Sequence, residues 1–336
     1  MAEFANVALH TAEEMVEAAL IASNTSAENA RHTARALVRA EADGQAGHGL
    51  SRVPSYAAQA KAGKVDGHAV PELEILRPGL IRIDAGHGFA YPAIAKALPQ
   101  LLIRANSCGI AAGSIHRSHH FGVAGHHCED LADKGYIAFV YGNAPKAMAP
   151  WGATKPVLGT NPIAFAAPMP DGPPLVIDMA LTTVARGKIL AAREVGDTIP
   201  EGWALGPDGE PTTDPVTALA GSMAPIGGAK GAALALMVEV MSAALAGAAF
   251  GTEASSLFDP EGPPPNLGQT ILAIDADTMS GGMFSARMAD LAGTYYELDG
   301  VRFPGARRIG LRARAETEGV RVNTLLLDQI RAIAAA

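Results

Sequence analysis

Helical and strand-like patterns alternate along residues 92–180, and this alternation constrains the fold more than any other feature of the chain. In some windows apolar residues recur with the spacing of one helix face, and in others they form the short runs typical of buried strands. The expected elements are helices at 92–106 and 123–134 and strands at 109–115, 136–142, 162–167 and 174–179. The pattern predicts an α/β protein with a sheet in its middle part.

The first forty residues are predicted to form two helices. Thr11 and Glu14 match a capping box in front of an apolar-periodic run, and Ser26 is a candidate cap of the second helix. The second helix is expected to end at Asp43-Gly44, because glycine tolerates a left-handed backbone. A short helix is expected to begin at Pro54. The N-terminal region is therefore expected to be helical.

Other segments carry more local signals. Two alternating runs, Leu73–Leu76 and Leu80–Asp84, flank a turn and predict a hairpin. Residues 195–225 are rich in Pro, Gly, Asp and Thr and are expected to cross the surface. The helical segment 228–246 is the most hydrophobic in the chain, so it is expected to be central. A strand is expected over Thr270–Asp275, with helices after it.

The charge balance bears on partners. The chain has 26 Lys and Arg against 34 Asp and Glu, a formal net charge of −8, and its basic residues are scattered. Nucleic acid is not expected as a partner, because phosphate binding needs a concentrated positive surface.

The same sequence bears on the compartment. Two cysteines, Cys108 and Cys128, are too few for a disulfide framework and indicate a reducing compartment. The first residues show no signal-peptide pattern. The apolar stretch Ala232 to Phe250 approaches membrane length, but it contains Glu239 and many small residues, so a core helix is predicted and no membrane span. We expect a cytoplasmic globular protein.

Several common site motifs are missing. The Gly-x-Gly-x-x-Gly fingerprint of the ordinary dinucleotide fold does not occur, and neither do G-x-S-x-G or CxxC. Gly227-Gly228-Ala229-Lys230-Gly231 lacks the Ser or Thr of a P-loop. This segment is either an anion cradle at a helix start or a simple turn.

A histidine between two glycines opens the first candidate site, Gly47-His48-Gly49-Leu50-Ser51-Arg52. Flanking glycines allow a ligand to approach closely, and histidine titrates in the range needed to give a proton to a reduced carbonyl or imine. Arg52 could clamp a carboxylate with two hydrogen bonds. The alternative is a helix-capping His48 and an Arg52 in a surface ion pair.

The second candidate site is a histidine cluster: five of the ten histidines lie within residues 116–127. One hypothesis is a metal site. The spacing argues against it, because HExxH is absent and adjacent histidines of a strand point to opposite faces. The other hypothesis is a strand end that lines a cofactor pocket, with Gly122 opening the next helix.

The third candidate is Asp178, which ends the apolar run Leu175–Ile177. It follows Gly159-Thr160-Asn161-Pro162 and precedes Arg186-Gly187-Lys188. An aspartate in this place is either a helix cap or a ligand for a hydroxyl-rich group such as ribose.

Taken together, these motifs resemble the type-2 malate/L-lactate dehydrogenase family. The matching pieces, in the order of the family, are GHGLSR with Tyr56, SHHFGVAGHH at 118–127, APWGA at 149–153, LGTNPIAF at 158–165, VIDMA at 176–180, ARGK at 185–188, GGAKG at 227–231 and FPGARR at 303–308. The family contains malate, lactate, ureidoglycolate and sulfolactate dehydrogenases and reductases of Δ1-piperideine-2-carboxylate and Δ1-pyrroline-2-carboxylate.

The resemblance implies an NAD(P)-binding fold that is not a Rossmann fold, with a largely antiparallel or mixed sheet surrounded by helices, and a homodimer. We expect a helical, substrate-side domain made of residues 1–115 and 300–336, and an NAD(P)-binding domain of residues 116–299. NAD or NADP is the implied cofactor, and no metal ligands are assigned.

The resemblance also implies roles for residues. His48 corresponds to the acid–base residue, with His120 as a second candidate for the proton, and Arg52 to the carboxylate clamp. The implied substrate-binding residues are Arg52, Tyr56, Thr160, Arg186, Gly187 and Lys188. The implied cofactor-binding residues are His120, Phe121, Gly122, Val123, Ala124, Asp178, Met179, Ala180, Lys230, Pro304, Gly305, Ala306, Arg307 and Arg308.

Two departures from the family pattern concern the proton. Many members have Ser where this chain has Gly47, and the imine reductases have Asp where it has Lys188. Both partners of a Ser-His-Asp relay are thus missing. Either another group has to orient His48, or His120 takes part in the proton transfer. Lys188 is expected in malate and lactate enzymes, whereas IPEGWAL, GQTILAID and the short C-terminus are closer to imine reductases and sulfolactate dehydrogenases.

The predicted activity is hydride transfer between a nicotinamide and C2 of a small 2-oxo or 2-hydroxy acid of the malate, lactate or sulfolactate type. The alternative within the same fold is reduction of a cyclic 2-imino acid. A distant alternative is a histidine-rich metal hydrolase that uses residues 116–127.

Overall fold

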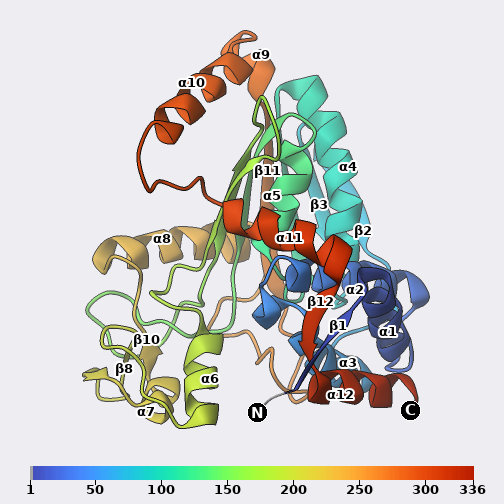
Figure 1. Ribbon diagram of the computed structural model, residues 1–336, viewed down its shortest axis with the longest axis vertical. Helices are drawn as coiled ribbons and strands as arrows, with labels where there is room; N and C mark the ends of the chain where they lie inside the picture. The colour runs from blue at the N-terminus through green and yellow to red at the C-terminus, as the bar shows by residue number, and fades with distance from the viewer. Residues whose placement is uncertain (1–2) are drawn as a thin grey trace.

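A seven-stranded mixed sheet forms the centre of the computed structural model, which describes residues 3–336 (Figure 1). The strand order is β2-β3-β4-β11-β5-β6-β7. Only β3 and β4 pair in parallel; every other neighbouring pair of this sheet is antiparallel. The strands are β2 (Glu72–Arg77), β3 (Leu80–Asp84), β4 (Ile110–Ser118), β5 (Tyr136–Gly142), β6 (Ile163–Ala167), β7 (Leu175–Met179) and β11 (Leu267–Asp275). The predicted fold class, helices around a largely antiparallel mixed sheet, is confirmed.

Side chains alternate between the two faces of the sheet, and each face is covered differently. On one face Ala138 and Val140 of β5 pack into a core with helices α4 (Ala90–Cys108) and α5 (Ala124–Ala132). On the other face Phe139 and Tyr141 pack with α8 (Ala229–Glu239) and the π-helical turn Val240–Ala244. The predicted helices and strands of residues 92–180 all form, with boundaries shifted by a few residues.

The two ends of the chain build a second core beside the sheet (Figure 1). Strand β1 (Phe4–Val7) pairs antiparallel with β12 (Val320–Asn323). The helices of this part are α1 (Leu9–Ile21), α2 (Ala27–Ala42), α3 (Val53–Lys61), α11 (Ala306–Glu318) and α12 (Thr324–Ala334). Among the described residues, no helix is long and apolar enough to cross a membrane.

Most of the predicted helix boundaries in this part are confirmed. The Ser26 side chain accepts a hydrogen bond from the Asn29 amide at 3.3 Å, and α2 ends at Asp43-Gly44 with Gly44 at φ +72°. The predicted Thr11 cap is wrong. Strand β1 ends at Val7 and the chain turns into α1 at once, so the helix begins at Leu9 without a side-chain cap.

A small peripheral unit occupies the stretch predicted as a surface excursion. Residues 204–223 form a three-stranded sheet from β8 (Ala204–Leu205), β9 (Pro211–Thr212) and β10 (Ser222–Met223), together with α7 (Pro215–Ala220). With α6 (Arg186–Val195) this unit encloses a separate apolar cluster around Ile189 and Ile199. These strands could not be predicted from the sequence, because each has only two residues and shows no alternating pattern among the many turn-forming residues.

Helix α8 does not lie in the centre of the molecule, so that prediction is wrong. Its inner side packs on the sheet through Ala235 and Val238, which are fully buried. Its outer side exposes Leu236 by 56%, and the following π-turn exposes Val240 by 52%. A helix that is apolar on all sides is normally enclosed. Among residues 3–336, nothing covers the outer half of α8.

Helices α9 (Ala276–Ser280) and α10 (Phe284–Tyr296) form an arm that projects beyond the end of the sheet (Figure 1). The predicted division into residues 1–115 with 300–336 and residues 116–299 stays a prediction. The second core sets the terminal helices apart, while β2, β3 and β4 pair in the same sheet as the later strands.

Candidate active site

The structure brings together the two predicted proton-transfer residues, which are far apart in sequence. His48 ends the 3-10 turn Ala46–His48, and His120 follows the end of β4. Nδ1 of His48 lies 3.2 Å from Nε2 of His120. The ring centres are 5.2 Å apart and the ring planes differ by 8°, so the imidazoles meet edge to edge through a hydrogen bond. Both rings keep part of their surface accessible.

The loop that carries His48 is fixed against α2. The Glu41 carboxylate accepts a hydrogen bond from the Leu50 amide at 2.9 Å. A Cβ at Gly49 would lie 2.2 Å from the same carboxylate, so only glycine allows this close approach. At Gly47 a Cβ would meet nothing within 4 Å. The two glycines that flank His48 therefore differ: Gly49 is needed for docking, and Gly47 leaves open space.

Two buried tyrosines extend the histidine pair. Oη of Tyr56, on α3, lies 2.5 Å from Nδ1 of His120 and 3.3 Å from Oη of Tyr91, on α4. Tyr56 has no exposed surface, and Tyr91 is 5% exposed. Tyr56 was predicted to bind substrate; the structure places its hydroxyl behind His120. Tyr91 was not among the predicted site residues, because it belongs to no sequence motif.

The surroundings keep these groups uncharged at neutral pH. Burial, together with the nearby Arg52 charge, lowers the pKa of His48 to about 4 and holds the pKa of His120 well below its usual range. Burial raises the pKa of Tyr56 to about 12. Each imidazole therefore carries one N–H donor and one acceptor nitrogen.

Arg52 lies beside the histidine pair with its charge unpaired. Its Nε donates to the Gly47 carbonyl at 2.7 Å, and its guanidinium lies over the Phe258 ring at 5.0 Å from the centroid. No carboxylate within residues 3–336 forms an ion pair with it. The alternative of a surface ion pair is therefore not seen, and the guanidinium is available to an anionic ligand.

The clustered histidines do not form one site. His119 bonds Gln59 at 3.0 Å, His126 bonds Asp43 at 2.8 Å, and His127 bonds the Phe121 carbonyl at 2.9 Å. Strand β4 ends at Ser118 and α5 begins at Ala124, both within the cluster, so successive side chains diverge. In the described part of the chain, no three His, Cys, Asp or Glu side chains are grouped to hold a metal ion.

Asp178, at the end of β7, meets the start of α5. Its Oδ2 accepts a hydrogen bond from the Gly125 amide at 2.8 Å. Burial raises the pKa of this carboxyl group. Asp178 thus binds the N-terminal turn of a helix distant in sequence, next to the predicted cofactor residues Phe121 to Ala124.

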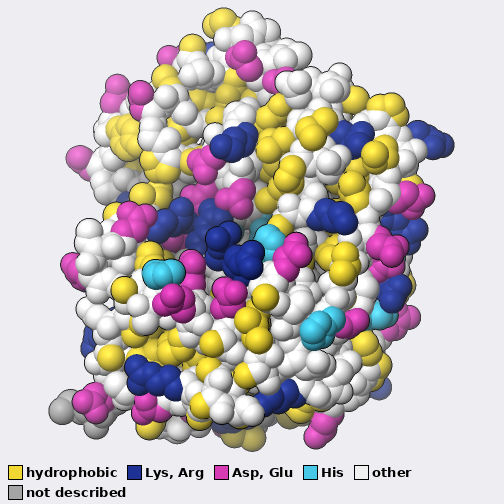
Figure 2. Space-filling view, turned by 90° about the vertical axis from the view of Figure 1, so that its right-hand side faces the viewer, with side chains coloured by type: hydrophobic (Ala, Val, Ile, Leu, Met, Phe, Trp, Pro, Cys, Tyr) yellow, Lys and Arg dark blue, Asp and Glu magenta, His cyan; other side chains and the backbone are white. Residues whose placement is uncertain are grey.

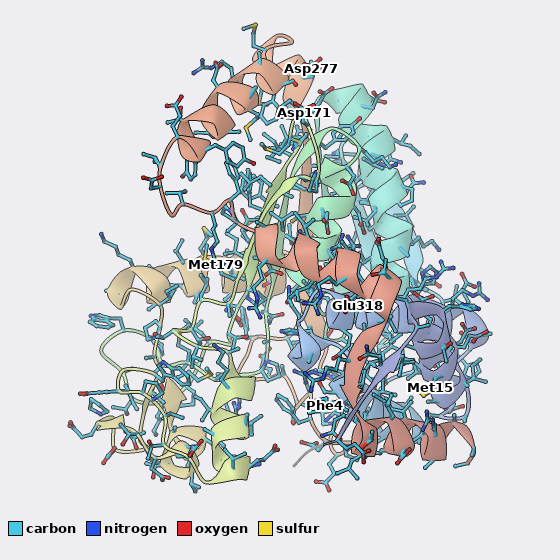
Figure 3. The ribbon with its side chains drawn as sticks, in the orientation of Figure 1. Phe4, Met15, Asp171, Met179, Asp277 and Glu318 are labelled. Carbon is cyan, nitrogen blue, oxygen red and sulfur yellow. The ribbon has the colours of Figure 1, made fainter. Side chains whose placement is uncertain are left out.

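A cavity of about 540 Å³ separates β7 from the start of α11. Its walls are Asp43, Gly44, Gln45, Val176, Asp178, Arg302, Phe303, Pro304, Gly305, Ala306, Arg307 and Arg308. Figure 3 shows Met179 at the end of β7, between α8 and the first turn of α11 in this view. All five predicted residues of the 304–308 segment line this cavity. Arg302 and residues 43–45 also line it, although no sequence motif predicted them as cofactor-binding residues.

The cavity suits a dinucleotide. Its volume lies in the range of small-molecule sites. Gly305 (φ +89°) precedes α11 and no side chain caps this helix. The Ala306 N–H bonds the Phe303 carbonyl, and the N–H groups that follow it in the first turn are available to a phosphate. The exposed Arg302 and Arg307 add positive charge, and Asp178 supplies a carboxyl group for a hydroxyl. The residues present therefore fit a nicotinamide dinucleotide.

Arg308 is held differently from its neighbour. Its guanidinium bonds the Glu129 carboxylate at 2.6 and 3.1 Å and that of Asp43 at 3.1 Å, and the residue is 9% exposed. Arg312 binds both of these carboxylates and Arg39 binds that of Glu129, so α2, α5 and α11 are joined by one ion cluster. In the structure Arg308 positions the wall of the cavity, while Arg307 faces outward.

The remaining predicted residues lie in or near the peripheral unit. Lys188, on α6, places Nζ 6.0 Å from the centroid of the Trp203 ring, and Arg186 begins the same helix. Lys230 is exposed in the first turn of α8, and the Thr160 carbonyl accepts from the Leu181 amide. No hydrogen bond or ion pair in the described chain joins these side chains to the histidine pair, so the structure does not bring them into direct contact with it.

This fold and this site define the class as a nicotinamide-dependent oxidoreductase: a neutral histidine pair, a free arginine, and a neighbouring cavity shaped for a dinucleotide. Residues 7–331 match the family model described as malate/L-lactate dehydrogenase. The chain belongs to the malate/L-lactate dehydrogenase family, which confirms the predicted family, enzyme class and nicotinamide cofactor.

Relatives in this family carry several activities. The chain is 48% identical to a (2R)-3-sulfolactate dehydrogenase (NADP(+)) of Chromohalobacter salexigens, over 98% of each chain. It is 40% identical to a Δ1-pyrroline-2-carboxylate reductase of Ancylobacter novellus, over 94% of this chain and 93% of the relative. The crystal structure of Δ1-piperideine-2-carboxylate reductase from Pseudomonas syringae pv. tomato superposes with a TM-score of 0.93 at 34% identity, covering 98% of this chain and 99% of that one.

Proposed function

We propose that the protein is an NAD(P)-dependent dehydrogenase that interconverts a small 2-oxo acid and the corresponding 2-hydroxy acid, of the sulfolactate, malate or lactate type. The observation that carries this proposal is the hydrogen-bonded His48–His120 pair beside the unpaired Arg52. The 48% identity to a sulfolactate dehydrogenase supports a substrate of this chemistry, and so does Lys188, a residue that the resemblance described above associates with malate and lactate enzymes.

Each residue of the site has a role in this proposal. Arg52 binds the substrate carboxylate with two parallel hydrogen bonds. His48 gives a proton to the C2 oxygen in reduction and removes it in oxidation, and His120 orients His48. When bound, the nicotinamide supplies or accepts the hydride at C2. The walls of the 540 Å³ cavity hold the rest of the dinucleotide, with Asp178 at a ribose hydroxyl and the start of α11 at a phosphate.

A second candidate is reduction of a cyclic 2-imino acid. The close superposition on a Δ1-piperideine-2-carboxylate reductase favours it, because the same backbone accommodates that ring. Here His48 would give its proton to the imine nitrogen, and Arg52 would bind the same carboxylate.

A substrate panel separates the two candidates. Pyruvate, oxaloacetate, sulfopyruvate, Δ1-pyrroline-2-carboxylate and Δ1-piperideine-2-carboxylate are each tested with NADH and NADPH by the absorbance of the nicotinamide. We expect the highest kcat/KM with one of the 2-oxo acids. A higher kcat/KM with a cyclic imine would reject the first candidate in favour of the second.

We also propose that the protein is a homodimer in which a second copy covers the outer side of α8. Leu236 and Val240 are exposed on this segment, and two apolar residues before and after it, Ile226 and Phe250, are 40% and 43% exposed. Soluble monomers rarely expose a large apolar patch. Leu236→Glu should halve the mass measured by light scattering, whereas Leu325→Glu, on the 77% exposed Leu325 of α12, should leave it unchanged. A monomeric wild type would contradict the proposal.

A cytoplasmic location is part of the same proposal. It rests on Cys108 and Cys128, which are free thiols in the structure, as a reducing compartment requires. The expected partners are the carboxylate substrate and a second copy; the net charge of −8 gives no reason to add a nucleic acid.

A further inference from the structure

The proton that His48 gives to the substrate has to be replaced, and the relay partners known from the sequence pattern are missing. Neither Gly47, which has no side chain, nor Lys188 forms a hydrogen bond with the His48 ring within residues 3–336. His48 Nδ1 has one recorded partner among the described residues, Nε2 of His120. The replacement proton therefore either enters from the substrate side or passes through His120.

Behind His120 a line of hydrogen bonds leads away from the substrate side. It runs from His48 Nδ1 to His120 Nε2 at 3.2 Å, from His120 Nδ1 to Tyr56 Oη at 2.5 Å, and from Tyr56 Oη to Tyr91 Oη at 3.3 Å. Every link joins atoms that can both donate and accept. Among these four residues, Tyr56 has no exposed surface, Tyr91 is 5% exposed, and the two imidazoles are partly accessible.

The far end of this line reaches a second cavity. Tyr91 forms part of the wall of a cavity of about 170 Å³ at the surface between α2, α4 and α5. Its polar wall residues are His32, Arg35, Arg39, His126, His127 and Asp130. Figure 2 shows basic side chains and a histidine gathered near the centre of this face of the molecule. Apolar side chains of α2, α4 and the segment before α5 complete the wall, and the cavity has room for several waters beside its polar groups.

We propose that Tyr91, Tyr56 and His120 form a proton relay that connects water in this second cavity to His48. In reduction, His48 Nε2 gives its proton to the C2 oxygen, and His48 Nδ1 takes the Nε2 proton of His120. His120 Nδ1 takes the hydroxyl proton of Tyr56, Tyr56 takes that of Tyr91, and Tyr91 takes one from water. Solvent thus supplies the one proton that the reduction consumes, and oxidation runs the same transfers backward.

The relay has two arrangements without net charge, which correspond to the acid and base forms of His48. When Tyr56 donates to His120, His48 Nε2 carries a proton and can act as an acid. When His120 donates to Tyr56, His48 Nε2 has a lone pair and can act as a base. Both arrangements require neutral imidazoles and phenols, the condition that burial imposes here. Tyr56 and Tyr91 are positioning residues in this proposal, because they act through His120.

The test uses Tyr56→Phe and Tyr91→Phe, with Tyr141→Phe as a matched control. Tyr141 is a buried tyrosine of β5 outside this line of hydrogen bonds. The rate of the chemical step is followed by nicotinamide absorbance in single turnovers, in mixtures of H2O and D2O. We expect each relay variant to lose roughly 10- to 100-fold in rate with KM values close to wild type, since an acid–base group contributes 10²–10⁴-fold.

Two further results are expected if the three groups act as a unit. The double variant should be no slower than the slower single variant, because either change cuts the same relay. A plot of the rate against the deuterium fraction of the solvent should be curved for the wild type, because several protons move in its relay. The same plot should be a straight line for the variants. Histidine ¹⁵N NMR of the free protein should show a changed tautomer of His120 in Tyr56→Phe, and Tyr141→Phe should match wild type throughout.

Additive losses, unchanged deuterium curves, or wild-type rates in both relay variants would each overturn the proposal. If Tyr56→Phe does not fold, Tyr91→Phe alone decides, because the recorded hydrogen-bond partner of its hydroxyl is Tyr56. The relay rests on the proposed function, yet the two fail differently. An inactive wild type on every substrate of the panel rejects the function, whereas an active enzyme that needs His48 but tolerates both phenylalanines rejects the relay alone.

Discussion

The buried carboxylate of Glu129 gives a sharp prediction about stability. Its side chain is 2% exposed and accepts hydrogen bonds from Arg39, Arg308 and Arg312 at 2.6–3.2 Å. Burial alone would raise its pKa, but the bonds to Arg308 and Arg312 outweigh burial and lower the pKa to about 2. A shift of this size from the ordinary value near 4.3 contributes roughly 3 kcal/mol to folding.

Glu129→Gln removes the negative charge and leaves three guanidinium groups facing a neutral amide. Breaking a buried ion pair in this way costs about 3–5 kcal/mol. For 336 residues with about 2.1 cal/mol/K each, the expected fall in Tm is about 4–7 °C. The same ion cluster positions the start of α11, so the Kd of the dinucleotide should rise as well.

Thermal unfolding and urea titration of the wild type and Glu129→Gln at pH 7 measure this loss of stability. The control is Asp328→Asn, which breaks the exposed Arg331–Asp328 pair and should cost less than about 1 kcal/mol. Because the folded-state pKa of Glu129 is depressed, its contribution is complete above pH 4.3 and disappears as the pH falls toward 2. Equal losses of stability in Glu129→Gln and Asp328→Asn at pH 7 would refute the reasoning.

Four further predictions concern the site. His48→Ala should lower kcat by about 10²–10⁴-fold with the Kd of the dinucleotide unchanged; near wild-type turnover would remove His48 from the reaction. Arg52→Lys should mainly raise KM for the acid, because lysine lacks the bidentate fork; an unchanged KM contradicts the clamp. Arg307→Ala should weaken binding of NADPH more than that of NADH in fluorescence titration, with the exposed Arg321→Ala as control; equal losses argue against a 2'-phosphate contact. Burial lowers the pKa of His48 to about 4, so protonation of the unfolded state between pH 6.5 and 4 should reduce stability, and His48→Ala should flatten this part of the urea profile; an unaltered profile contradicts a buried neutral imidazole.

The sheet and its helices could be predicted because their signals are local. A strand such as Tyr136–Gly142 is a short apolar run, and a helix such as Ala90–Cys108 repeats its apolar residues with its own period. The parallel pairing of β3 with β4 inside an otherwise antiparallel sheet has no such signal, because it depends on how α4 crosses between them. The motif around His48 and Arg52 indicated chemistry, and the family resemblance supplied the partner His120.

Tyr91 shows where a motif-based prediction ends. Its hydroxyl reaches that of Tyr56 from the first turn of α4, and the two residues are 35 positions apart. The Tyr91 hydroxyl also lies close to Gly122. A Cβ atom at Gly122 would be 2.7 Å from this hydroxyl. Sequence alone marks Gly122 as a helix opener, whereas the structure shows that its missing side chain also makes room for Tyr91. Such a contact is visible only after the elements are packed.

The failure of the α8 prediction has a different origin. The sequence indicates that residues 228–246 are apolar on all sides, since the helix has no polar face. The prediction of a central helix assumed that the fold of one chain encloses such a helix completely. The sheet buries Ala235 and Val238 on the inner side, while Leu236 and Val240 remain exposed on the outer side. Apolar composition alone therefore does not tell how much of a helix its own chain covers, and the uncovered half of α8 is the reason why we propose that a second copy packs there.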